Sequence, residues 1–179
     1  SKKANIFLRV GVILGMAILG GVLLYAYFAS NITMLPQDDL FDIGACFFGL
    51  IILLVISIMM AFERKEGDET TVFFYLLMIL LFLEGASDIN STLVEGKTNW
   101  NLMNAVSNTV EFSLMPLIVF VFWNYQNSLY SEFNKVDKLM TRFLFGFVIF
   151  DIVFIGLNIP FGYLFTINDE GHLLYSNGY

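Results

Sequence analysis

Residues 43–62 read IGACFFGLIILLVISIMMAF, a run of twenty residues without a charge. A helix needs roughly 20 mainly apolar residues to cross the hydrocarbon layer of a membrane, so this stretch is long enough to span it. Four similar runs accompany it along the chain, and together they predict an all-α membrane protein, a polytopic bundle of about five transmembrane helices in the cell membrane. The predicted spans are Ile6–Ser30, Ile43–Phe62, Thr71–Ser91, Leu102–Tyr125 and Met140–Thr166.

The composition supports the lipid bilayer as the main partner of the chain. Hydrophobic residues make up 58% of the sequence and charged residues 14%, and the mean hydropathy is +0.74. A soluble domain is about half apolar and about a quarter charged, so this apolar surplus exceeds what one soluble core can hide. The nine Lys and Arg are scattered and form no basic patch, which argues against nucleic acid.

The sequence offers no chemistry of the usual catalytic or metal-binding kinds. Cys46 is the only cysteine, which excludes an internal disulfide, a CxxC site and a zinc cluster. His172, the only histidine, has no partner at metal-ligand spacing, and we expect it at the surface of the tail. No Ser/His/Asp set, HExxH, P-loop or GxGxxG occurs. We therefore expect no enzyme activity, no cofactor and no metal.

The distribution of basic residues predicts the orientation, because cytoplasmic loops are enriched in Lys and Arg. Eight of the nine fall on one set of loops and helix ends, which predicts a cytoplasmic N-terminus and an extracytoplasmic tail. These eight are Lys2, Lys3, Arg9, Arg64, Lys65, Lys135, Lys138 and Arg142. Only Lys97 falls on the other side. The first apolar run is longer than the roughly 7–15 residues of a signal peptide core, so we expect it to be retained as a span.

Polar residues inside the predicted spans are the candidates for function, since such residues are costly in a membrane. Four carry carboxyl groups and three carry amides, and their spacing of three, four or seven places them on common helix faces. They are Glu84, Asp88, Asn104, Asn108, Glu111, Asp151 and Asn158. If the last three spans touch, these faces converge on a pocket open to the outside, suited to a small cationic or hydrogen-bonding ligand. Two alternatives remain: hydrogen bonds that only join helices, and a path for ions or protons.

Gly11 and Gly15 form a GxxxG motif in the first span. Such a motif permits close approach of two helix backbones. It predicts either tight helix packing within the chain or a homodimer, and we favour the first.

From about Ile43 onward the chain resembles the multi-helix membrane sensor regions at the N-termini of Gram-positive histidine kinases and diguanylate cyclases. The likeness rests on the basic turn ERK at 63–65, FLEGASDINSTLV at 82–94, a short loop to Trp100, a proline in mid-span at Leu114–Leu117, and FGYLFTINDEGHLLYSNGY at 161–179. The last segment is the most specific, because it looks like the small extracytoplasmic hairpin that those sensors place between helices.

The resemblance implies a domain organisation and a role. Residues 1–30 would be an extra N-terminal helix, 43–166 a four-helix sensor-like region and 167–179 an extracytoplasmic tail or hairpin. That family usually has about seven helices before a cytoplasmic output domain, so we expect this chain to be the front part of a longer protein. Its implied function is to detect an extracytoplasmic or membrane-borne signal and to relay it by helix rearrangement to a kinase or cyclase. A small transporter or channel subunit, and a structural subunit of a membrane complex, are the alternatives.

Overall fold

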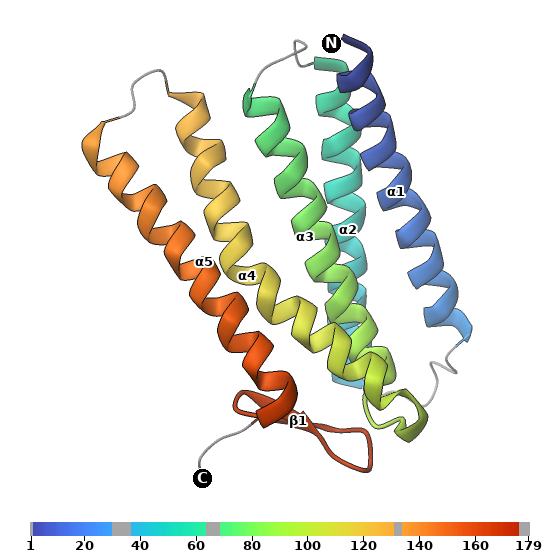
Figure 1. Ribbon diagram of the computed structural model, residues 1–179. Coiled ribbons are helices and arrows are strands. Elements are labelled where there is room, and N and C mark those ends of the chain that lie inside the picture. The colour runs from blue at the N-terminus through green and yellow to red at the C-terminus, as the bar shows by residue number, and fades with distance from the viewer. Residues whose placement is uncertain (1, 30–36, 64–68, 131–133, 176–179) are drawn as a thin grey trace.

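The computed structural model describes residues 2–29, 37–63, 69–130 and 134–175, which form five long helices and a short hairpin (Figure 1). Each helix is long and apolar enough to cross a membrane, which confirms the predicted all-α multi-pass fold. The helices are α1 (Lys2–Ala29), α2 (Gln37–Glu63), α3 (Glu69–Val94), α4 (Asn101–Leu129) and α5 (Lys135–Phe161). A 3₁₀ turn, η2 (Thr98–Trp100), leads into α4.

Helix α3 lies at the centre of the bundle, between α1 and α2 on one side and α4 on the other (Figure 1). One apolar cluster joins α3 to its first two neighbours through Phe82, Ala86, Ile89 and Leu93 of α3. A second joins its other half to α4. Because both clusters include side chains of α3, this helix holds the other three together.

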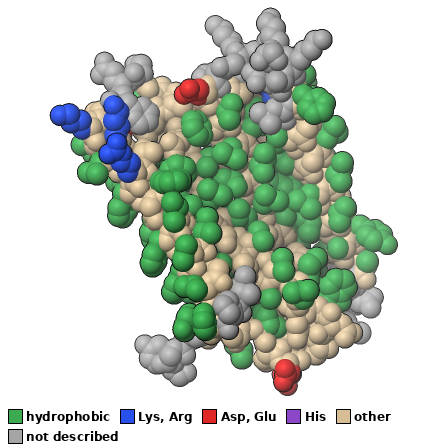
Figure 2. Space-filling model, in the orientation of Figure 1, with side chains coloured by type: hydrophobic (Ala, Val, Ile, Leu, Met, Phe, Trp, Pro, Cys, Tyr) green, Lys and Arg blue, Asp and Glu red, His purple; other side chains and the backbone are tan. Residues whose placement is uncertain are grey.

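The outer surfaces of the bundle are apolar. Large hydrophobic side chains on α1, α2 and α5 are exposed, as expected for residues that face lipid chains rather than water. In Figure 2 hydrophobic side chains cover the middle of the visible face, and Lys and Arg gather at the end where α5 begins. We call this the basic end, and the opposite end, which carries the hairpin, the hairpin end. The basic turn at Arg64 and Lys65 lies outside the described residues.

Arg9 is buried near the basic end, where its Nη1 donates a hydrogen bond to the carbonyl oxygen of Ala61 at 3.1 Å. The last four carbonyls of a helix have no partner within that helix. Arg9 of α1 therefore supplies a hydrogen-bond donor to one of the unpaired carbonyls at the end of α2.

The glycines at helix contacts are not those of the GxxxG motif. A Cβ at Gly85 would lie 3.0 Å from Leu50 Cδ2, and one at Gly20 would lie 3.4 Å from Phe82 Cζ. Gly11 and Gly15 instead face open space, so the prediction that they pack tightly within the chain is wrong.

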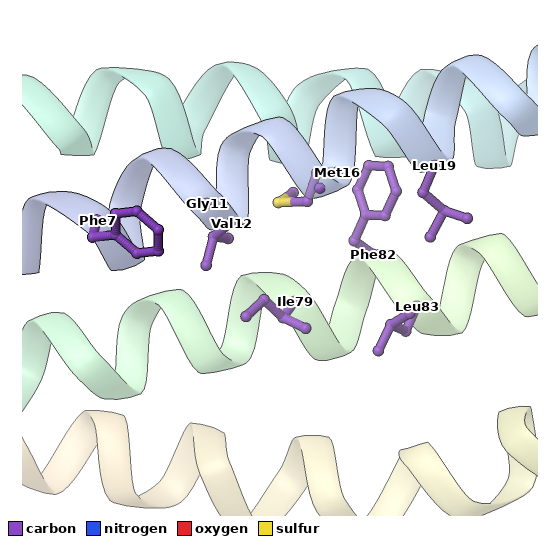
Figure 3. Close-up of a pocket in the computed structure, with 9 residues that line it drawn as sticks. Phe7, Gly11, Val12, Met16, Leu19, Ile79, Phe82 and Leu83 are labelled. Atoms are coloured by element: carbon purple, nitrogen blue, oxygen red, sulfur yellow. The ribbon is translucent and has the colours of Figure 1, made fainter. Parts of the chain in front are cut away.

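The two open glycines line a shallow apolar groove of about 480 Å³ between α1 and α3, shown in Figure 3. It is lined by Phe7, Gly11, Val12, Gly15, Met16 and Leu19 of α1, and by Ile79, Phe82 and Leu83 of α3. The homodimer alternative for the motif stays a prediction.

Helix α5 ends at Phe161, five residues before the predicted end of the last span. Gly162 follows in the left-handed conformation, with φ of 63°, which ends the helix. Strands β1 (Phe165–Ile167) and β2 (Leu173–Tyr175) then pair antiparallel, so the hairpin that the sequence likeness implied is present. The hairpin begins at Phe165, inside the range 43–166 that was expected to be helical. The predicted span was too long because a glycine that ends a helix within an apolar run is easily missed in a sequence.

The predicted orientation can be tested with cysteine labelling in a Cys46→Ser background. We expect a membrane-impermeant maleimide to label Asp169→Cys, in the exposed turn of the hairpin, in intact cells. Lys138→Cys, at the basic end, should react only after the membrane is permeabilised. Labelling of Lys138→Cys in intact cells would reverse the orientation.

Candidate functional site

A polar pocket of about 300 Å³ opens at the hairpin end, between α2, α3, α4 and strand β2. Three of the residues singled out from the sequence line it: Asp88, Asn108 and Glu111. The other lining residues are Asp39, Ser91, Thr92, Glu95, Leu173 and Tyr175. We call this the hairpin pocket.

Asp88 is bonded to α2 through its side chain and to the next turn of α3 through its backbone carbonyl. Its Oδ2 accepts a hydrogen bond from Cys46 Sγ of α2 at 2.9 Å. Its backbone carbonyl accepts from Ser91 Oγ at 2.9 Å and Thr92 Oγ1 at 3.0 Å. Cys46 thus has a role beyond apolar packing, since it links α2 to a carboxylate of the pocket.

Glu95, just after α3, connects the next helix, α4, to the hairpin, which is distant in sequence. Its Oε2 accepts from Asn104 Nδ2 of α4 at 2.8 Å, and its Oε1 accepts from the backbone N–H of Leu173 in β2 at 2.9 Å. His172 Nδ1 lies 3.4 Å from the same Oε1. Hydrogen bonds to an ionised group are about twice as strong as neutral ones, so this carboxylate is a strong polar attachment of the hairpin.

Two asparagines of α4 extend the attachment into the bundle. Asn104 is fully buried and also donates from Nδ2 to the carbonyl oxygen of Gly171 at 3.0 Å. Asn108 donates to Asn104 Oδ1 at 2.7 Å and to its carbonyl oxygen at 2.9 Å. The polar stripe predicted on this helix therefore forms a chain of hydrogen bonds that runs from the hairpin turn to the pocket wall.

The tip of the hairpin fits closely on the α3–α4 loop. Gly171 has φ of 85°, and a Cβ there would lie 2.9 Å from the backbone N and C atoms of Lys97. The Gly96 N–H donates to the Gly171 carbonyl at 3.1 Å. Only glycine fits at position 171, since any side chain would collide with backbone rather than with a movable group.

The remaining predicted site residues lie away from the pocket lining. Glu84 is one turn below Asp88 on α3, about 6 Å further from the hairpin end. Asp151 lies on α5, where its Oδ2 is enclosed and receives no hydrogen bond from the described part of the chain.

Asn158 anchors the hairpin instead of lining the hairpin pocket. Its Oδ1 accepts from the N–H groups of Leu164 at 2.6 Å and Phe165 at 3.2 Å, and its Nδ2 donates to the Phe165 carbonyl at 3.2 Å. It also borders a separate pocket of about 430 Å³ between α4, α5 and β1.

The hairpin pocket is strongly acidic. Four of its nine lining residues carry carboxyl groups, and none is Lys or Arg. No three His, Cys, Asp or Glu side chains in the described ranges lie close enough together to hold a metal ion. Because its carboxylates are spread around the wall, this arrangement suits a polyatomic cation that reaches several of them better than a single ion.

Comparisons with protein-family models, with curated proteins and with solved structures found no match to this chain. The likeness to bacterial sensor regions thus rests on its own sequence segments.

Sequence reasoning missed Glu95 and Asp39. Both read as ordinary loop acids, one beside Gly96 and the other in a segment with two further aspartates. Asp39 lies in the first turn of α2, where the helix dipole favours a negative charge. A usable signal for Glu95 was its position directly before a glycine at the end of an apolar run, because a side chain there faces the next helix and not only water.

Removing the Glu95 carboxylate should loosen the hairpin. In Glu95→Ala the Leu173 N–H loses an ionised acceptor, a bond worth about 1.5–3 kcal/mol, so its hydrogen exchange should accelerate roughly 10- to 100-fold. Glu170→Ala, which removes an exposed carboxylate of the hairpin turn, is the control and should leave this amide unchanged. Equal exchange in both variants would contradict the role given to Glu95.

Asn158→Leu should destabilise the protein by about 2–4 kcal/mol, because it leaves buried backbone groups of Leu164 and Phe165 without partners. Unfolding by a denaturing detergent in mixed micelles measures this change. Asn124→Leu is the matched control, since the bond of Asn124 within the described residues is to the carbonyl of Phe120 in its own helix. We expect it to cost less than about 1 kcal/mol.

Proposed function

We propose that this chain is the membrane-embedded receptor part of a sensor protein, and that it binds a small organic cation in the hairpin pocket from the extracytoplasmic side. The observation that carries the proposal is the double position of Glu95. It lines the pocket, and it also holds the hairpin through Leu173. Ligand binding in the pocket and attachment of the hairpin therefore depend on the same carboxylate.

The chemistry of the pocket supports a cation as the signal. Asp39, Asp88, Glu95 and Glu111 face a volume of about 300 Å³, which excludes large ligands. Like charges in a medium of lower dielectric repel one another more than in water, so a cation placed among these carboxylates relieves that repulsion. The hydroxyls of Ser91 and Thr92 donate to the Asp88 carbonyl, which leaves their oxygens as further acceptors.

The hairpin supplies a means to report binding. A ligand shifts an equilibrium only by its difference in affinity between two states. A cation that pairs with Glu95 competes with the Leu173 N–H and with His172, so the attached and released hairpins differ in affinity for it. Because the hairpin follows α5 directly, its release also changes the contacts that hold the end of α5 in place. The proposed output is a rearrangement of α5 relative to α4, passed to a kinase or cyclase domain as the sequence likeness implies.

We expect 1,4-diaminobutane to raise the melting temperature of the protein in nanodiscs, and the neutral 1,4-butanediol to leave it unchanged. Asp88→Asn and Glu111→Gln should each weaken diamine binding about tenfold or more, because each removes one charge partner. Asp169→Asn makes the same change of charge outside the pocket and should have an effect of less than about twofold.

Two outcomes would count against the receptor. Equal stabilisation by diamine and diol, or unchanged binding in both pocket variants, would rule out recognition of a cation in this pocket. Diamine flux through proteoliposomes that falls in Asp88→Asn would instead favour a transporter.

A further inference from the structure

The carboxyl groups of the hairpin pocket lie at two depths along the bundle. Helix α3 runs toward the hairpin end, and α2 and α4 run away from it (Figure 1). Asp88 stands seven residues before Glu95, about 10 Å deeper on the same helix face. The hydrogen bond from Cys46 to Asp88 sets the level of α2 against α3. Asp39 stands seven residues before Cys46, so it lies near the level of Glu95.

Helix α4 is aligned with α3 in the same way. The hydrogen bond from Asn104 Nδ2 to Glu95 Oε2 places these two residues at one level. Glu111 stands seven residues after Asn104, about 10 Å deeper on the same face, so it lies near the level of Asp88. The pocket therefore has an outer tier of carboxyl groups, Asp39 and Glu95, and an inner tier, Asp88 and Glu111.

Uncharged acceptors lie between the two tiers. Ser91 and Asn108 line the pocket about 6 Å below the outer tier and about 4 to 5 Å above the inner one. Asn108 is only 4% exposed; its Nδ2 donates to Asn104, and its Oδ1 receives no hydrogen bond from the described residues. Ser91 Oγ donates to the Asp88 carbonyl and can still accept. A buried acceptor without a donor is costly, so this middle level calls for a donor from the ligand.

The three levels have the spacing of nitrogen atoms in a linear polyamine. An extended chain with bonds of about 1.5 Å advances about 1.25 Å per bond, so nitrogens separated by three carbons lie about 5 Å apart and those separated by four about 6 Å apart. These lengths match the two steps between the levels. The ammonium ends of such a chain suit the carboxylates, and an amine within it supplies the donor that the middle level lacks.

We propose that the cation bound in the hairpin pocket is a linear aliphatic triamine that lies along α3 and α4. Its charged ends pair with the outer and inner tiers, and its middle nitrogen donates to Asn108 Oδ1 and Ser91 Oγ. This inference rests on the cation receptor proposed above and names the ligand class of the same pocket.

Calorimetric titration of the wild-type chain in phosphatidylcholine nanodiscs tests the ligand. We compare spermidine, whose amines are separated by three and four carbons, with 1,8-diaminooctane, which is equally long but has no middle nitrogen, and with 1,4-diaminobutane. Spermidine should bind at least about tenfold more tightly than either, the effect expected of one hydrogen-bonded charged group. Branched tris(2-aminoethyl)amine carries several amines but does not extend over both tiers. It should bind no better than 1,4-diaminobutane.

Asp39→Asn tests the outer tier. The shorter diamine is held by the inner tier and the middle level, since it does not reach both tiers. Asp39→Asn should therefore weaken spermidine binding about tenfold and 1,4-diaminobutane binding less than about threefold. Asp38→Asn makes the same change of charge one residue away, outside the pocket lining, and should leave both affinities unchanged.

Ser91→Ala tests the middle level. It removes one acceptor, so it should reduce the preference for spermidine over 1,8-diaminooctane about threefold or more. Ser113→Ala is the control, because it removes a hydroxyl that bonds to the Thr109 carbonyl within α4 and does not line the pocket.

The outcomes separate this inference from the receptor itself. Equal affinity for spermidine and 1,4-diaminobutane would overturn the triamine and leave the cation receptor standing, whereas no binding of any amine would remove both. Binding of 1,8-diaminooctane or of the branched amine as tightly as spermidine would also overturn the triamine. An equal loss of diamine and spermidine binding in Asp39→Asn would contradict the two tiers.

Discussion

The absence of water from the hydrocarbon layer is the constraint on which this structure depends. Every polar group placed there needs a partner within the protein, and the five helices satisfy almost all their backbone groups internally. The exceptions lie at helix ends, where side chains act as substitutes. Arg9 serves the end of α2, and Asn158 serves the backbone that follows α5. Glu95, just after α3, serves the hairpin in the same way. These three side chains therefore serve the points where the regular backbone of the helices stops.

This constraint also explains which features the sequence could reveal. A helix that faces lipid must be apolar over about 20 residues, so the five spans were visible as runs of hydrophobic residues. The end of α5 could not be seen in the sequence, because the chain stays apolar beyond Gly162 and only the conformation of that glycine ends the helix. The hairpin was recognisable from its aromatic segments and its acidic turn, which are local patterns.

The candidate site was harder to predict, because it depends on which helices touch. Spacing along α4 correctly placed Asn104 and Asn108 on one face, and the two are hydrogen-bonded. It gave no means of knowing that the partner of Asn104 would be Glu95, a loop acid by sequence. Asn158 shared a predicted face with Asp151, yet its side chain is hydrogen-bonded to the backbone at the start of the hairpin. Asp151 makes no such contact with the described residues, so the two residues do not form one site. The prediction that Gly11 and Gly15 pack within the chain was wrong for a related reason: small residues permit close contact, but only a facing helix creates it.

The central place of α3 has a consequence for how the protein enters the membrane. Helices of a growing chain leave the ribosome in order, so α3 is inserted before α4 exists to cover it. Glu84 and Asp88 then face lipid or the insertion machinery, with only α1 and α2 as neighbours. An isolated acidic residue at the centre of a span costs about 2.5–3.5 kcal/mol on insertion scales. The apolar residues of α3 offset this cost, but its stable position is reached only when α4 arrives. The third and fourth helices thus assemble in the membrane as a single unit. The hairpin is synthesised after them and attaches to this pair last.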